Sequence, residues 1–96
     1  MELTIIGEFR ARPGQEAAVE AAIRQVVPPT RREAACLSIG AYRSVRDAGV
    51  FFIHSRWVDA DAFEAHSLLP HTVEFLATVG PLLTHEVEVA RVTPIS

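Results

Sequence analysis

The sequence predicts one α+β domain in which short apolar strands alternate with amphipathic helical regions. The chain has 96 residues, which suits one domain and is too short for two. Hydrophobic residues make up 49% of it, so we expect apolar surface to be covered on both faces of a sheet or by a partner. Along the chain the apolar spacing switches between a period of two and a period of 3.6, and these switches predict the element order β-α-β-β-α-β.

The first strand and the first helix are predicted in the N-terminal third. Residues Leu3 to Phe9 are apolar and β-branched, which is typical of a strand. Pro13 suits a first helical turn, where a backbone N–H has no intrahelical partner. From Gln15 onward one apolar stripe recurs at helical spacing: Ala18, Val19, Ala22, Ile23 and Val26. Pro28-Pro29 predicts that the helix ends or kinks there.

A hairpin is predicted in the middle of the chain. Cys36 to Val45 reads as the second strand, and Val50 to Val58 as the third. The turn between them is Arg46-Asp47-Ala48-Gly49, where we expect Gly49 to supply a positive φ. The start of the third strand, VFFI, is apolar on both faces, which indicates that both faces are covered.

The last third predicts two short helices and a fourth strand. Asp59 or Asp61 caps the first of these helices. Pro70 begins the second, which Gly80 ends. We expect the buried face of this second helix to consist of Val73, Leu76 and Val79. His85 to Val92 alternates strictly and predicts a half-exposed strand.

This order of elements predicts a ferredoxin-like fold, an antiparallel four-stranded sheet with helices on one face. The second face of such a sheet is wet unless another subunit covers it. Because the strands are apolar, we expect a homodimer that packs sheet against sheet.

Charge and composition exclude several classes of function. The formal net charge is −3 and the basic residues form no tract, so nucleic-acid binding is not expected. No apolar run approaches the roughly 18 residues of a membrane span, so no membrane association is expected. The start, MELTIIGEFR, lacks the basic residues of a signal peptide, and Cys36 is the single cysteine. We therefore expect a cytoplasmic protein.

A stretch from residue 54 to residue 71 contains three of the four histidines and the only tryptophan. The end of the third strand and the two following helices could form a pocket roofed by Trp57, Phe63 and Phe75, into which histidine nitrogens point. His66 and His71 are the candidate proton acceptors. A neutral imidazole at a helix N-terminus, as predicted for His71, could accept a proton from a phenol.

Each of these residues also has an alternative, purely structural interpretation. Trp57 could be a core residue, His66 a cation at a helix C-terminus and His71 a solvent-exposed first-turn residue. His54 is predicted on the opposite strand face from Trp57 and could contact the substrate or the subunit interface. A metal site is not predicted, because the sequence has no HxH, HExxH or CxxC motif and one helical face cannot present both His66 and His71.

The chain resembles the antibiotic biosynthesis monooxygenase family, of the dimeric α+β barrel superfamily, over nearly its whole length. RPGQE at 12–16 is similar to the family's opening of the first helix, and TRREAACLS at 30–38 to its Thr/Ser-Arg-x-Glu-x-Gly-Cys-Leu segment. Ser55 stands where the family usually has Glu. The family's signature from tryptophan to histidine, and its continuation, are matched by Trp57, Asp59, Phe63, His66, Pro70, His71 and Phe75.

The resemblance implies a homodimer that oxidises a small electron-rich aromatic compound, such as a quinol, an anthrone or a polyketide-like phenol, with O₂ and without any cofactor. It implies His71 and His66 as catalytic residues. The expected substrate contacts are Trp57, Phe63, Phe75 and His54. Two alternatives stay open on the same fold: a non-catalytic small-molecule-binding dimer and an isomerase of a small metabolite.

Overall fold

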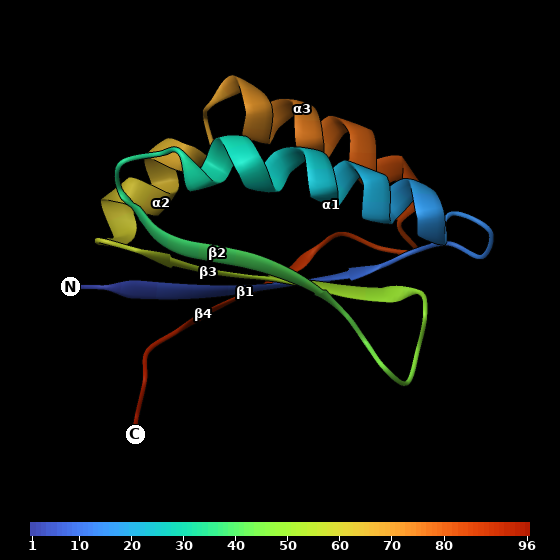
Figure 1. Ribbon diagram of the computed structural model, residues 1–96, viewed down its shortest axis with the longest axis horizontal. Coiled ribbons are helices and arrows are strands. Elements are labelled where there is room, and N and C mark those ends of the chain that lie inside the picture. Colours follow the sequence, from blue (N-terminus) through green and yellow to red (C-terminus); the bar gives the residue numbers. More distant parts are fainter.

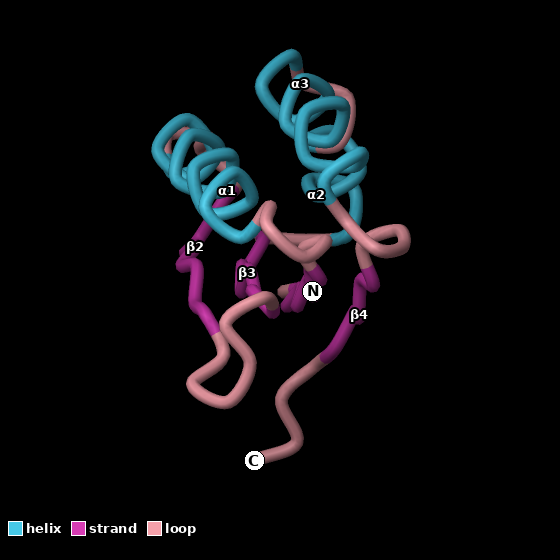
Figure 2. Tube along the Cα trace, turned by 90° about the vertical axis from the view of Figure 1, so that its right-hand side faces the viewer, coloured by secondary structure: helices cyan, strands magenta, loops and turns pink.

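The computed structural model describes residues 1–96 and has all its helices on one face of a four-stranded antiparallel sheet (Figures 1 and 2). The strand order is β2-β3-β1-β4. The elements are β1 (Leu3–Arg10), α1 (Glu16–Arg31), β2 (Cys36–Arg43), β3 (Val50–Trp57), α2 (Ala60–His66), α3 (Pro70–Val79), the 3₁₀ turn η1 (Gly80–Leu82) and β4 (Glu88–Val92). The predicted ferredoxin-like α+β fold is thereby confirmed.

The register of the sheet decides which side chains face the helices. Ile5 of β1 lies opposite Ser55 of β3, and both are buried. Because side chains alternate along a strand and cross-strand partners point the same way, Ile53 and Trp57 share this face with Ser55. The residues between them, His54 and its neighbours, point to the face without helices. Figure 2 shows that face, on the side where the β2–β3 loop and the C-terminal segment extend.

The core lies between the sheet and the helices α1 and α3. Val19 of α1 and Val79 of α3 are fully buried, and Phe75 meets Phe9 edge-on with 5.7 Å between ring centroids. The predicted stripe of α1 supplies the helical half of this core, through Val19, Ala22, Ile23 and Val26.

The buried face of α3 differs from the prediction. Thr72, Phe75 and Val79 are buried, whereas Val73 and Leu76 are 53% and 47% exposed. The phase is set by Phe75, because an aromatic ring removes more apolar area from water than valine or leucine does. Positions three before and four after it then share its face.

Helix α1 does not end at Pro28-Pro29 but continues to Arg31. A proline inside a helix removes the hydrogen bond to the carbonyl four residues earlier. Those carbonyls belong to Arg24 and Gln25, which are exposed, so water can satisfy them. With 16 residues α1 is the longest helix, and no helix here combines the length and apolar character that crossing a bilayer requires.

The β2–β3 turn closes without the positive φ expected at Gly49. Gly14, before α1, is the residue with a positive φ, of 86°. In the hairpin, the Ser44 hydroxyl accepts hydrogen bonds from the backbone N–H groups of Arg46 and Asp47, each at 3.1 Å. The Asp47 carboxylate accepts one from the N–H of Gly49 at 2.9 Å. Side-chain acceptors therefore stabilise this turn.

Candidate functional site

Two short helices bring His66 and His71 next to each other. The Asp59 carboxylate accepts a hydrogen bond from the N–H of Ala62 at 2.8 Å, and this cap begins α2. His66 ends α2, and Pro70 begins α3 one residue before His71. The ring centroids of the two histidines lie 5.9 Å apart.

The two imidazoles converge on the carboxylate of Glu33. This residue follows α1 in a turn where its N–H donates to the carbonyl of Thr30 and its carbonyl accepts from the N–H of Cys36, both at 3.0 Å. Glu33 Oε2 lies 2.7 Å from His66 Nδ1 and 2.8 Å from His71 Nε2. The side chains of Glu33, His66 and His71 are 15%, 12% and 26% exposed. We call these three residues the Glu–His–His cluster.

The Glu33 carboxylate fixes the tautomers of both rings. An ionised carboxylate only accepts hydrogen bonds, so His66 donates from Nδ1 and His71 donates from Nε2. In the neutral form of each ring, His66 Nε2 and His71 Nδ1 then keep a free lone pair. The hydroxyl of the buried Thr72 also contacts the His66 ring, 3.2 Å from Nδ1. The cluster thus presents two imidazole nitrogens able to accept a proton.

The indole of Trp57 supports His66 from one side. Trp57 is 1% exposed, and its Nε1–H donates to the Ser55 hydroxyl at 3.0 Å. Its ring lies 4.6 Å from the His66 ring and 5.8 Å from that of Phe63, measured between centroids. Phe63 is covered in turn by the Arg91 guanidinium, 5.3 Å from its centroid. These contacts restrict the orientation of the His66 imidazole.

An apolar hollow of about 150 Å³ lies between the sheet and the helices beside His66. It is lined mainly by aliphatic and aromatic side chains, among them Ile53, Phe63 and Phe75, and by the polar Ser55 and Thr72. A dry apolar cavity of about 150 Å³ is large enough to hold benzene. The hollow therefore accommodates a single aromatic ring against an imidazole edge.

The structure separates the predicted site residues into three positions. His66, Phe63 and Phe75 line the hollow. Trp57 does not line it but packs behind His66 and Phe63. His71 does not line it either, and joins it through the Glu33 carboxylate.

His54 does not belong to this site, which corrects its assignment as a substrate contact. It pairs with Ile6 and Gly40 across the sheet, and it alternates with Ser55, which lines the hollow. Its side chain therefore points to the sheet face without helices.

Sequence reasoning missed Glu33. The residue stands inside the TRREAACLS segment, but nothing local pairs it with histidines 33 and 38 positions away. His66 and His71 do lie on different helices, as their spacing predicts. Two helices present them, and a carboxylate from the turn after α1 connects them.

The sole thiol lies close to the cluster but stays protonated. Burial raises the pKa of Cys36, and the Glu33 carboxylate raises it further. A thiol of raised pKa is a poor nucleophile at neutral pH. Cys36 is therefore not a candidate for covalent catalysis.

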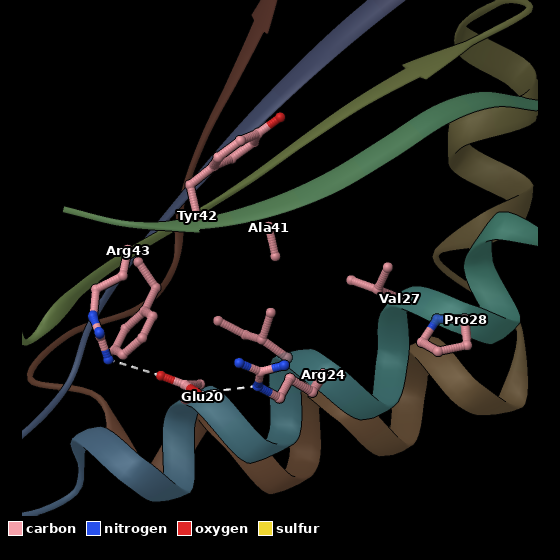
Figure 3. A pocket seen from close by; sticks show the side chains of 9 residues that line it. Glu20, Arg24, Val27, Pro28, Ala41, Tyr42 and Arg43 are labelled. Carbon is pink, nitrogen blue, oxygen red and sulfur yellow. Dashed lines mark hydrogen bonds and ion pairs between the residues drawn. The ribbon is translucent and has the colours of Figure 1, made fainter. Parts of the chain in front are cut away.

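A wider groove at the sheet edge is a weaker candidate. It has a volume of about 440 Å³ and lies between α1 and β2 (Figure 3). Both of its guanidinium groups are engaged by its one carboxylate, because Glu20 accepts from Arg24 at 3.0 Å and from Arg43 at 2.9 Å. None of the predicted site residues lines it.

The fold and the site define a ferredoxin-like protein with a carboxylate-bridged histidine pair beside a small apolar hollow. The family model described as antibiotic biosynthesis monooxygenase matches residues 3–78, and the chain belongs to this family.

Known proteins resemble the chain over almost its full length. A Mycobacterium tuberculosis protein named "Putative monooxygenase Rv0793" is 32% identical over 97% of this chain and 91% of its own. The solved structure of Rv0793 has a TM-score of 0.93 at 30% identity, and the match covers 100% of this chain and 97% of that one. The crystal structure of PA3566 from Pseudomonas aeruginosa has a TM-score of 0.92 at 29% identity, with 99% and 95% covered.

Proposed function

We propose that the protein is a monooxygenase that oxidises a small electron-rich aromatic compound with O₂ and needs no cofactor. The proposal depends on one observation, the Glu–His–His cluster at the wall of an apolar hollow. A phenol bound in the hollow meets the His66 imidazole at one wall and mainly aliphatic and aromatic carbon elsewhere. The family membership and the relatives' names support the reaction type.

The chain's own residues supply a proton acceptor and a dry environment. His66 Nε2 accepts the phenolic proton, while the Glu33 carboxylate stabilises the resulting imidazolium through Nδ1–H. His71 donates to the same carboxylate and holds it in place. The mainly apolar lining of the hollow disfavours water beside a bound ring, which favours electron transfer from the phenolate to O₂.

The reaction balances without an external reductant when the substrate is a quinol. One atom of O₂ enters the ring as a hydroxyl group and the quinol becomes a quinone. The other oxygen atom leaves as water with two hydrogens. For benzene-1,4-diol this is C₆H₆O₂ + O₂ → C₆H₄O₃ + H₂O. The substrate provides all four electrons, so neither flavin, haem nor metal is required.

The size of the hollow favours the smaller of the expected substrates. A cavity of about 150 Å³ matches one ring rather than three fused rings. We therefore expect single-ring quinols to react faster than anthrones, which require the helices to move outward.

An oxygen electrode tests the proposal. EDTA-treated protein is mixed with a panel of quinols, phenols and anthrones, and O₂ uptake and product mass are followed. We expect turnover that falls by about 10²-fold or more in His66→Ala, which removes the proton acceptor. His85→Ala is the matched control, because His85 is exposed and its ring nitrogens contact Thr84 and Glu88, away from the cluster. Equal rates in the two variants overturn the assignment.

The same panel separates the alternative functions. Ligand-induced thermal stabilisation without O₂ uptake indicates a binding protein. Solvent deuterium entering the substrate under anaerobic conditions, without O₂ consumption, indicates an isomerase. Either result contradicts the proposed oxidation.

We also propose that two copies pack sheet against sheet. The helices cover one face only, and β-strand alternation places Ile6, Tyr42, Phe52 and Val92 on the other face. Tyr42 is 60% and Val92 37% exposed in the single chain. Sedimentation at low micromolar concentration should give a dimer, and a well-folded monomer there contradicts this assembly.

A further inference from the structure

We propose that the Glu–His–His cluster binds a divalent transition-metal ion of the zinc class, and that the bound ion inhibits the oxidation. The inhibitory role rests on the proposed function, whereas the binding site does not. The three ligand atoms are Glu33 Oε2, His66 Nδ1 and His71 Nε2.

The ligand atoms are already close to a coordination geometry. They all lie within 4.8 Å of one another, and the carboxylate oxygen is 2.7 and 2.8 Å from the two nitrogens. Zinc binds imidazole nitrogen and carboxylate oxygen at about 2.0–2.2 Å, so tetrahedral ligands stand about 3.3–3.5 Å apart. To admit the ion, the two oxygen–nitrogen separations must widen by about 0.5–0.8 Å through side-chain rotation.

The chemistry of the three ligands selects the class of metal. Two imidazoles and one carboxylate suit zinc and other first-row transition metals, whereas magnesium and calcium prefer oxygen alone. With neutral histidines the cluster carries one negative charge, which attracts a dication. The side chains are 12–26% exposed, so an ion can enter from solvent and still be partly shielded from it.

Metal binding and proton acceptance exclude each other through the tautomers. An ion on His66 Nδ1 and His71 Nε2 requires lone pairs on the nitrogens that now donate to Glu33. Each ring must then carry its hydrogen on the other nitrogen. For His66 that nitrogen is Nε2, the proposed proton acceptor, and the Thr72 hydroxyl lies 3.5 Å from it. The metal-bound protein therefore has no free imidazole lone pair at the substrate.

The only tryptophan of the chain is a built-in reporter for this site. Trp57 stacks 4.6 Å from the His66 ring, so a paramagnetic ion bound to His66 quenches its fluorescence. Titration of EDTA-treated, desalted protein with Co²⁺ should give saturable quenching at one ion per chain, together with visible absorption bands of a low-symmetry cobalt site. Isothermal titration with Zn²⁺ should give the same stoichiometry.

Three variants and one control test the ligand assignment. Glu33→Gln, His66→Ala and His71→Ala should each weaken Co²⁺ binding by at least about tenfold. Glu33→Gln keeps the shape of the side chain and guards against loss of folding, which circular dichroism checks. His85→Ala, which removes the exposed histidine beside Glu88, should bind as the unchanged protein does. No saturable quenching, or equal weakening in His85→Ala, overturns the site.

The inhibitory role has its own readout in the oxygen electrode. Active EDTA-treated protein that loses O₂ uptake in step with Zn²⁺ occupancy supports both proposals. Active protein that binds no metal overturns the metal site and leaves the proposed function intact. Inactive EDTA-treated protein that regains activity with metal overturns both the cofactor-free oxidation and the inhibition, while Co²⁺ quenching still reports the site.

Discussion

Replacing Glu33 by glutamine tests whether the Glu–His–His cluster is a unit of stability as well as chemistry. The substitution keeps the size of the side chain and one oxygen acceptor but removes the negative charge. Both hydrogen bonds, from His66 Nδ1–H and His71 Nε2–H, then become bonds between neutral groups.

The expected loss follows from the two bonds and their burial. A hydrogen bond to a charged group contributes about 1.5–3 kcal/mol and a neutral one about 0.5–1.5 kcal/mol, so each bond loses about 1 kcal/mol. The Glu33 side chain is 15% exposed, so solvent screens little of this. We expect a decrease of about 2 kcal/mol in the free energy of unfolding. For a domain of this size that corresponds to a lowering of Tm by about 8–16 °C.

Urea unfolding measures this loss in metal-free protein at fixed concentration, because the proposed dimer would make stability concentration-dependent. Trp57 fluorescence reports the environment of the cluster, and far-ultraviolet circular dichroism reports the whole fold. Glu20→Gln is a matched control. Glu20 also accepts two hydrogen bonds from cations, but Arg24 and Arg43 are 76% and 57% exposed. Exposed ion pairs contribute about 0–1 kcal/mol, so this control should change little.

A double-mutant cycle identifies the interaction responsible. Glu33→Gln and His66→Ala together should cost less than the sum of the two single changes, by about 1 kcal/mol. The reasoning is refuted if Glu33→Gln destabilises the protein no more than Glu20→Gln does, or if the two site substitutions are additive.

Three further predictions concern the surroundings of the site. Burial raises the pKa of the Cys36 thiol above its ordinary value of 9.0. The protonated thiol therefore stabilises the folded state fully below pH 9.0, and this stability is lost as the pH rises through the raised pKa. Urea midpoints should accordingly fall more steeply with alkaline pH in the native protein than in Cys36→Ala. Trp57→Phe leaves the buried Ser55 hydroxyl without its hydrogen-bond donor. Beyond the loss of packing, it should lower the free energy of unfolding by about 1–3 kcal/mol, measured by circular dichroism. Adding Ser55→Ala should partly restore the stability. Val79→Ala, at a fully buried position, should lower the unfolding free energy by about 2–3 kcal/mol, whereas Val73→Ala, at a 53% exposed one, should change it by less than about 0.5 kcal/mol.

Local patterns were sufficient to predict the fold. The apolar, β-branched run of β1, the apolar run of β3, the alternation of residues 85–92 and the apolar stripe of α1 gave the order of elements, because each pattern is typical of one kind of element. The predictions of a helix end and of a positive φ were wrong where neighbouring groups compensate locally for the residue concerned. Pro28-Pro29 stays helical because the carbonyls it leaves free are exposed. The turn at Gly49 closes because Ser44 and Asp47 provide acceptors.

The candidate site was predicted only in part, because half of it depends on contacts between distant segments. Trp57, Phe63 and His66 are near neighbours in sequence, and the helical and strand periods bring them together. Glu33 comes from the far end of α1, and its position depends on how α1 packs. His54 lies on the face of β3 opposite to Ser55 and Trp57, as strand alternation predicted, and that face does not line the hollow.

The three members of the Glu–His–His cluster come from three different pieces of the helical layer, 33 and 38 positions apart along the chain. None of these pieces can assemble the cluster alone, and neither can a loosely packed intermediate with native helices but undocked α1 and α3. Proximity of the Glu33 carboxylate to the two rings is thus a marker of completed tertiary assembly. A ribosome-bound nascent chain would acquire it only after α3 has emerged from the exit tunnel.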